Sequence, residues 1–477
     1  MRVTLILLLL LTYQLLFPQA KAFESFVSDS VMKHGFVSFH IIDSENGTTL
    51  FDHNSGKNLV PASVMKLVTT AAAIELLGPD HTFTTAIGYN GHLNRRSGVL
   101  KGNIIVKGGG DPALGSQEFG DFYAGFEGKL AGEILKTGIR KIKGRVVTDD
   151  SYFDYQPVPG KWLWEDIGNY YGAGAYGVSV YDNTCRIHFR TSSGGSDHSV
   201  TGIFPEEYRP ELNDMLMVSG TTDEGYVYAA PYSAWGWMAG SIPSGQEDFV
   251  LKASITDPPL VMAAIINKRL KDSGIKITGE PSTVRYEPGS ADGFTVISEI
   301  ISPSLKEIIE VLNHESVNLY AEHLVKEIGK RFKNSGSTDS GIVVIDEFLA
   351  GQGITTGALF MEDGSGLSPK NSVNARTMTD LLVYMKNESR HAEEFVNSLP
   401  AAAKEGTLRN HFRDPVFETR MRAKSGSMTR VRGYAGYLQS VSGKELVFCI
   451  IVNNFTGRSG IIVRHIENIL AETILSN

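Results

Sequence analysis

A serine and a lysine stand three residues apart at the start of the apolar stretch 61–79, and this pair can support acyl-transfer chemistry. Residues i and i+3 lie on one face of a helix, so the Ser63 hydroxyl and the Lys66 amine can meet there. A serine hydroxyl is a poor nucleophile unless a base within hydrogen-bond reach takes its proton. Desolvation favours the neutral amine of a lysine, and a buried helix would supply that desolvation. The spacing therefore predicts a nucleophilic serine with a lysine as its base.

Two further short motifs follow in an order that fits this chemistry. A Ser-Val-Asn sequence at 316–318 lies in a long helical region, and a Lys-Ser-Gly sequence at 424–426 begins a strand-rich tail. Ser-x-x-Lys, Ser-x-Asn and Lys-Thr/Ser-Gly in this order are typical of penicillin-recognising serine enzymes. Together the motifs predict a serine site formed by Ser63, Lys66, Ser316, Asn318 and Lys424.

The chain repeats each motif elsewhere, so the surrounding sequence has to distinguish the copies. Ser30 and Lys33 belong to a brief segment that stops at a His-Gly pair, whereas the Ser63 helix ends at a glycine cap, Gly78, followed by a proline. Ser44 and Asn46 are expected in a hairpin turn, and Ser372, with Asn374, as a cap before a helix. Lys136-Thr137-Gly138 is expected at a helix end. We therefore expect these copies to be structural.

The elements that must position the site come from both ends of the chain. A hairpin with an Asn-Gly turn precedes the Ser63 helix, and strong helical periodicity runs from Leu305 to Phe332. The tail is expected to contain a helix at 377–386, a strand from Lys424, a hairpin of 433–440 and 445–455, and an amphipathic helix at 460–475. Strands at both ends with helices between them predict one α/β (α+β) domain made of 23–84 and 287–477, with two domains inserted in its middle: 85–165 joined to 251–286, and 166–250, which is β-rich.

The first 22 residues predict a secretory signal, with a positive start, a Leu-rich run and the cleavage pattern Ala20-Lys21-Ala22. A membrane anchor is the alternative, although the apolar run is short for a membrane span and the sequence Thr12-Tyr13-Gln14 interrupts it. No later segment is apolar enough to span a membrane. The processed chain is therefore expected to be a soluble protein of the periplasm or cell envelope.

The net charge of the chain, its cysteines and its histidines argue against several classes of partner and cofactor. The formal net charge of −8 becomes −10 when Arg2 and Lys21 are removed, which argues against a nucleic-acid partner. Cys185 and Cys449 lie in separate strand-like runs and are expected to be buried thiols. The histidines have no metal-ligand spacing, and no glycine-rich nucleotide loop precedes a helix, so neither a metal nor another cofactor is expected.

Beyond these patterns, the chain resembles the low-molecular-mass class C penicillin-binding proteins, the D-alanyl-D-alanine carboxypeptidase/endopeptidase family, over nearly its whole length after residue 22. The resemblance includes Gly-Gly-Gly-Asp-Pro at 108–112 and Asp-Gly-Ser-Gly at 363–366. Further matching stretches are 60–66, 312–322, 405–408 and 423–427. The resemblance implies an antiparallel sheet flanked by helices, no cofactor, and periplasmic action on peptidoglycan stem peptides, with acylation by β-lactams.

The resemblance also implies a role for each motif residue. Ser63 would attack the carbonyl between the last two D-alanines, with Lys66 as base. Ser316 would relay a proton to the leaving amine, and Asn318 would hold Lys66 and the substrate amide. Lys424, Ser425, Gly426 and Ser427 would form the strand that binds the substrate, with Lys424 and Ser427 at its terminal carboxylate. The oxyanion would rest on the backbone N–H groups of Ser63 and Ser427.

Some residues carry open alternatives. Asp149 resembles the family aspartate that reaches the diamino acid of the stem peptide, but an aspartate in a turn at a strand end is an equal alternative. Ser425 stands where threonine is usual and keeps the hydroxyl. Ser-Pro-Lys-Asn at 368–371 stands where other members often have arginine and tyrosine, so a substrate contact at these residues is left open. An aromatic cluster, Trp162, Trp164, Tyr170 and Tyr171, could grip a glycan, although packing of the inserted domain is the favoured interpretation.

The sequence therefore predicts a serine DD-peptidase and leaves open the balance between carboxypeptidase and endopeptidase activity. One alternative is a β-lactamase or esterase on the same site, for which no motif identifies a route for the deacylating water. The other alternative is a catalytically silent scaffold that binds peptidoglycan. Loss of Ser63, Lys66 or Lys424 would have indicated such a scaffold, but all three residues are present.

Overall fold

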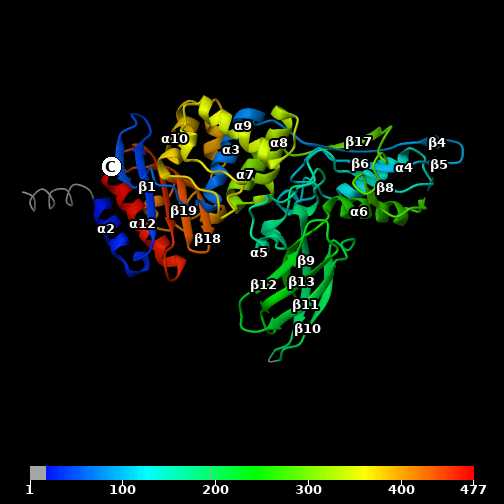
Figure 1. Ribbon diagram of the computed structural model, residues 1–477, viewed down its shortest axis with the longest axis horizontal. Coiled ribbons are helices and arrows are strands. Elements are labelled where there is room, and N and C mark those ends of the chain that lie inside the picture. The colour runs from blue at the N-terminus through cyan, green and yellow to red at the C-terminus, as the bar shows by residue number, and fades with distance from the viewer. Residues whose placement is uncertain (1–17, 194) are drawn as a thin grey trace, which may run out of the picture. The chain divides into compact units, whose positions relative to one another are not determined.

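The computed structural model describes residues 18–193 and 195–477, and the chain divides into two compact units (Figure 1). Unit 1 consists of the residues up to Pro79 together with Ile309–Val317 and Ile342–Asn477. Unit 2 consists of Asp80–Ile308 and Asn318–Gly341. The finer division of the chain into three domains stays a prediction.

A five-stranded antiparallel sheet forms the centre of unit 1, in the order β18-β19-β20-β1-β2. Its strands are β1 (Phe36–Asp43), β2 (Thr49–His53), β18 (Met421–Met428), β19 (Val431–Gln439) and β20 (Glu445–Asn453). Strand β1 pairs with β20 over its full length, so segments about 400 residues apart in sequence share one sheet. This arrangement confirms the predicted fold class, with strands from both ends of the chain in one antiparallel sheet.

Helices cover both faces of this sheet. They are α2 (Pro18–Ser28), α3 (Lys66–Leu77), α10 (Ala375–Asn387), α11 (Ala392–Asn397) and α12 (Ser459–Ser476), while α7 (Leu305–Glu315) and α9 (Thr338–Gly351) each contain a boundary between the units. Side chains alternate between the faces of a strand, so Phe39 of β1 lies in the apolar core with residues of α2 and α12. The next residue, His40, faces α10 and hydrogen-bonds to Thr379 with Nδ1 and Oγ1 2.7 Å apart.

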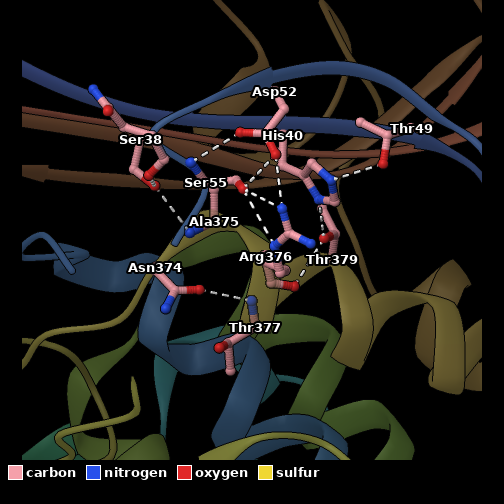
Figure 2. A network of polar contacts seen from close by, with 11 residues as sticks. Ser38, His40, Thr49, Asp52, Ser55, Asn374, Ala375, Arg376, Thr377 and Thr379 are labelled. Atoms are coloured by element: carbon pink, nitrogen blue, oxygen red, sulfur yellow. Dashed lines mark hydrogen bonds and ion pairs between the residues drawn. The ribbon is translucent and has the colours of Figure 1, made fainter. Parts of the chain in front are cut away.

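Polar contacts fix the start of α10 on β1 and β2 (Figure 2). The Asn374 side chain accepts a hydrogen bond from the Thr377 N–H and caps the helix, so the sequence-based choice of Ser372 as the cap was wrong. Arg376 donates from Nη2 to Asp52 at 2.7 Å, next to the buried His40. The network joins helix and sheet, and it gives hydrogen-bond partners to the buried His40, Ser55 and Thr379, whereas Arg376 and Asp52 stay partly exposed.

The predicted helical run from Leu305 to Phe332 is two helices. Helix α7 ends at Glu315 and α8 (Asn318–Lys333) begins three residues later. Between them Ser316 has φ of +59°, a left-handed conformation that ends the first helix. Apolar periodicity continues across the break because both helices bury one face, and for that reason the pattern did not reveal the turn.

Unit 2 contains two larger sheets, in the orders β16-β8-β6-β3-β17 and β15-β7-β5-β4. Helices α4 (Phe126–Lys136) and α6 (Pro258–Asp272) pack against them, and unit 2 also contains α5 (Trp164–Ile167) and α8. The strands are β3 (Thr84–Tyr89), β4 (His92–Asn94), β5 (Val99–Lys101), β6 (Ile104–Lys107), β7 (Lys141–Ile142), β8 (Val146–Asp149), β15 (Lys276–Ile277), β16 (Ser282–Thr283) and β17 (Thr295–Ile301). The expected strand-rich organisation of this part of the chain is confirmed.

Two three-stranded sheets, β10-β9-β14 and β11-β13-β12, make up most of the predicted β-rich insertion (Figure 1). Their strands are β9 (Thr184–Thr191), β10 (His198–Phe204), β11 (Glu211–Val218), β12 (Glu224–Ala229), β13 (Trp235–Ile242) and β14 (Phe249–Ser254). Cys185 in β9 and Cys449 in β20 are buried free thiols, as expected.

The predicted signal, residues 1–22, lies mostly outside the described residues, and its last five form the start of α2. In the described part of the chain, no helix combines the length and the apolar character that a membrane span requires.

Candidate active site

The predicted nucleophile lies in a short 3-10 helix, Ala62–Met65, that leads directly into α3. This differs from the expected α-helix start, because α3 begins only at Lys66. Side chains at i and i+3 eclipse in a 3-10 helix, which places the Lys66 amine over the Ser63 hydroxyl. Nζ and Oγ are 2.9 Å apart, and the Lys66 side chain is fully buried. The helix then ends as predicted at Leu77, where Gly78 adopts φ of +86°.

A main-chain carbonyl also holds the lysine. Lys66 donates from Nζ to the Ser365 oxygen at 2.7 Å, and Thr69, one turn along α3, donates to the Gly364 oxygen at 2.6 Å. Two successive carbonyls of the Asp-Gly-Ser-Gly loop therefore face α3, the helix that begins at Lys66. The sequence revealed this loop only as a family stretch and gave it no role.

The loop owes its shape to a buried aspartate. Asp363 is fully buried, and its two carboxylate oxygens accept hydrogen bonds from Gly366 N at 2.7 Å, Ser368 N at 2.6 Å and the Asn371 side chain at 2.8 Å. Gly366 has φ of +82°, and a Cβ there would lie 2.0 Å from the Ala62 oxygen. The chain therefore needs glycine at this position to bring the loop against the turn of the nucleophile.

The second and third motifs meet through their side chains. Lys424 of β18 donates from Nζ to Ser316 Oγ at 2.9 Å and to the Ser425 carbonyl at 3.0 Å. Burial lowers the pKa of Lys424 well below its usual range, and the nearby Lys66 lowers it further. The two lysines thus lie close enough for the charge of Lys66 to oppose protonation of Lys424.

Strand β18 runs beside Ser63, the predicted nucleophile. A Cβ on Gly426 would lie 2.5 Å from the Pro61 oxygen and 3.1 Å from Ser63 N, so only glycine permits this approach. Ser425 donates from Oγ to Thr407 Oγ1 at 2.8 Å. Ser427 is exposed and lines a cavity of about 450 Å³ together with Arg430 and Phe455. The cavity adjoins the end of the strand at which the substrate carboxylate is expected.

Unit 1 therefore brings together Ser63, Lys66, Ser316, Lys424, Ser425, Gly426 and Ser427. The other two predicted site residues belong to unit 2. Asn318 is the first residue of α8, and its Nδ2 donates to the Tyr171 carbonyl at 2.8 Å. Asp149 ends β8, where its Oδ1 accepts from Ser151 Oγ at 2.6 Å and its Oδ2 lies 3.6 Å from Lys107 Nζ.

Apart from Ser372, which does not cap α10, the repeated motifs occupy the structural positions expected from their surroundings. Ser30 is exposed and donates to Asp29, Lys136 pairs with Glu133 at the end of α4, and Ser44 donates to the Glu445 carbonyl beside the hairpin turn. None of these three serines and lysines contacts Lys66 or Lys424 in the structure as described.

Comparisons with known proteins agree with this geometry. A model of the family described as "D-Ala-D-Ala carboxypeptidase 3 (S13) family" matches residues 19–471. The chain is 28% identical over 460 residues to a D-alanyl-D-alanine carboxypeptidase of an Actinomadura species, covering 92% of this chain and 82% of that protein. It is 25% identical over 430 residues to the D-alanyl-D-alanine carboxypeptidase DacB of Haemophilus influenzae, covering 88% and 85%.

A solved structure supports the fold. The crystal structure of penicillin binding protein 4 (dacB) from Haemophilus influenzae superimposes with a TM-score of 0.80 at 22% identity. The superposition covers 93% of this chain and 97% of that one. Both inserted and sheet-forming segments therefore have counterparts in a known penicillin-binding fold.

Proposed function

The chain belongs to the D-Ala-D-Ala carboxypeptidase 3 (S13) family of serine-type peptidases, and we propose that it cleaves the D-alanyl peptide bonds of peptidoglycan through an acyl-enzyme on Ser63. The observation that carries this proposal is the hydrogen bond between the buried Lys66 amine and the Ser63 hydroxyl, 2.9 Å long. A neutral lysine in this position accepts the hydroxyl proton as the oxygen attacks.

Acylation begins when Ser63 Oγ attacks the carbonyl carbon of the penultimate D-alanine. The proton of Oγ passes to Lys66 Nζ, and the negative charge that develops on the carbonyl oxygen is stabilised by the backbone N–H groups of Ser63 and Ser427. The tetrahedral intermediate then collapses, the C–N bond breaks, and the leaving amine takes a proton relayed through Ser316 from the lysines. Water attacks the resulting ester and releases the enzyme, with Oγ regaining a proton.

Recognition of the substrate's carboxylate belongs to the end of β18. Lys424 supplies positive potential beside Ser316, and the exposed Ser427 hydroxyl donates a hydrogen bond to the carboxylate. Carboxypeptidase and endopeptidase cleavage share this acyl-enzyme and differ only in whether the leaving amine belongs to D-alanine or to a cross-linked diamino acid.

Two assignments in unit 2 complete the proposal. Asn318 is assigned to the amide of the substrate and to Lys66, as in the family motif. Asp149 is assigned to the amine of the diamino acid, although its contacts with Ser151 and Lys107 are those of an aspartate in a turn. An Asp149→Asn variant should lose preference for substrates with a free side-chain amine, whereas an aspartate confined to the turn would leave that preference unchanged.

The proposed substrate is a stem peptide of the cell wall, and the proposed location is the periplasm after removal of residues 1–22. The Leu-rich start of the chain and the small-x-small sequence 20–22 support this location. β-Lactams acylate the same serine because they present a carbonyl and a carboxylate in comparable positions.

Intact-mass spectrometry with benzylpenicillin tests the proposal. We expect the protein to gain the mass of one penicillin, and we expect Ser63→Ala to remove the adduct while Ser30→Ala, which changes the exposed copy of the motif, retains it. Intact penicillin without an adduct would indicate a silent scaffold. Hydrolysed penicillin without an adduct would indicate a β-lactamase.

A further inference from the structure

One face of the sheet β11-β13-β12 carries aromatic side chains where a solvent-facing sheet normally carries polar ones. Alternate residues of β13 and β12 point to this face, and they are Trp235, Trp237, Tyr226 and Tyr228. The intervening residues Val227 and Met238 are buried on the opposite face. The alternation therefore uses large side chains on both faces, although only one face is covered by the protein.

The aromatic rings form a connected array. Trp237 and Tyr228 are direct cross-strand partners and stack with ring centroids 5.2 Å apart and planes 12° apart. The ring centroid of Trp237 lies 5.6 Å from that of Trp235 and 6.2 Å from that of Trp164 in α5. Tyr226 extends the array from Tyr228 at 6.5 Å. We call these five residues the aromatic array.

Much of this array remains open to solvent. The exposed fractions are 56% for Trp235, 48% for Trp164 and 40% for Tyr226. Two residues of β11 that share the face, Met215 and Met217, are 50% and 64% exposed. Contiguous exposed apolar surface of this kind marks a binding site more often than it occurs by chance. Of the aromatic residues that the sequence suggested for packing or glycan binding, Trp162 is buried, whereas Trp164 is half-exposed.

Charge restricts what can bind. The remaining outward residues of the face and its ends are Glu211, Asn213, Glu224, Ala239 and Ser241, which supply carboxylate, amide and hydroxyl groups. These outward positions of β11, β12 and β13 include no lysine or arginine. A polyanion would therefore meet repulsion without a compensating cation, and a neutral ligand rich in hydroxyl and amide N–H donors fits better.

We infer that the aromatic array binds the neutral glycan of the cell wall, a chain of N-acetylated sugars. The C–H groups of a sugar ring pack against the electron-rich surface of tryptophan and tyrosine, while its hydroxyl and amide groups donate to the surrounding acceptors. This inference rests on the proposed function, since the stem peptide that Ser63 would cleave is attached to such a glycan. The array would hold the polymer while the peptide is processed.

Titration of the full processed chain with penta-N-acetylchitopentaose, followed by tryptophan fluorescence and calorimetry, tests the inference. We expect saturable binding, about tenfold weaker binding for Trp237→Ala, and a loss in the same range for Tyr228→Ala, since each removes one ring of the stacked pair. Phe122→Ala is the matched control, because Phe122 is 52% exposed in the same unit but lies outside the array. Circular dichroism establishes that each variant is folded.

Pelleting with insoluble chitin, an uncharged polymer of N-acetylated sugars, provides the second measurement. Reduced pelleting of Trp237→Ala but not of Phe122→Ala supports the inference. Equal binding by all variants, or no binding by the wild type, overturns it. Self-association that is lost in Trp237→Ala, without glycan binding, would instead make the face an interface between copies. A penicillin adduct on the same wild-type sample separates failure of this inference from failure of the proposed function.

Discussion

The main-chain carbonyl oxygen of Ser365 accepts a hydrogen bond of 2.7 Å from the Lys66 amine, which also donates to the Ser63 hydroxyl at 2.9 Å. A lysine side chain is long and flexible, and two fixed partners confine its Nζ to one place. Because one partner is a main-chain atom, the position of the base depends on the conformation of the loop 363–371.

Asp363→Ala should therefore slow acylation although Asp363 is not assigned to the substrate. Without the carboxylate, the N–H groups of Gly366 and Ser368 lose their acceptors, and the Ser365 carbonyl is no longer held against Lys66. We expect the second-order rate constant for benzylpenicillin to fall about 10- to 100-fold, as displacements near 1 Å produce. Asp414→Ala is the control, since Asp414 also accepts a main-chain N–H in unit 1 but lies in another turn. A rate equal to that of the control would contradict the role of the loop.

Comparing Gly366→Ala with a second glycine variant separates the effect of the loop's close approach to Ala62 from the effect of backbone strain. A methyl group there would overlap the Ala62 oxygen at 2.0 Å, in addition to the cost of φ near +82°, about 1–3 kcal/mol. Gly443 in the β19–β20 turn has φ of +91°, and a Cβ added to it would have no atom within 4 Å, so Gly443→Ala reports the strain alone. Urea unfolding should show the larger loss in free energy of unfolding for Gly366→Ala. The acylation rate should fall only in Gly366→Ala. Equal losses in both variants would mean that the approach to Ala62 is not needed.

Residue types and their spacing were sufficient to predict which side chains come together. Ser63, Lys66, Ser316 and Lys424 meet as the motifs indicated. The Ser365 carbonyl could not be predicted in this way, because every residue has a carbonyl and only the fold places one near the amine.

Local conformation was also only partly predictable. Ser316 has positive φ without being glycine, so no residue type signalled the break between α7 and α8. Of the aromatic array only Trp164 was singled out from the sequence, because a two-residue alternation predicts a strand but not whether its outer face is covered. The antiparallel sheet, by contrast, could be predicted, since the alternation of apolar and polar residues and the turn residues can be recognised in the local sequence.

The charge of Lys424 should make recognition of a carboxylate depend on pH. Burial, and then the Lys66 charge, lower the pKa of Lys424, so its ammonium loses its proton at a pH well below the usual value near 10.4. The ratio of kcat/KM for a D-Ala-D-Ala peptide to that for its carboxamide should therefore fall as pH rises through this lowered pKa. In Lys424→Ala the ratio should be small at every pH, whereas exposed Lys404→Ala should keep the wild-type profile. A ratio that is independent of pH in the wild type would exclude a charged Lys424 from carboxylate binding.

The network at the start of α10 should make unit 1 less stable in acid. Burial lowers the pKa of His40, the nearby Arg376 lowers it further, and Asp52 opposes them (Figure 2). The unfolded chain, with a histidine pKa near 6.5, then binds a proton that the folded chain rejects, so stability is present above about pH 6.5 and is lost as pH falls through the folded pKa. Urea unfolding between pH 7.5 and 5 should show a smaller loss for His40→Gln than for the wild type. His34→Gln, at an exposed histidine of the same unit, should keep the wild-type slope, and an unchanged slope in His40→Gln would show that His40 is not the group that titrates.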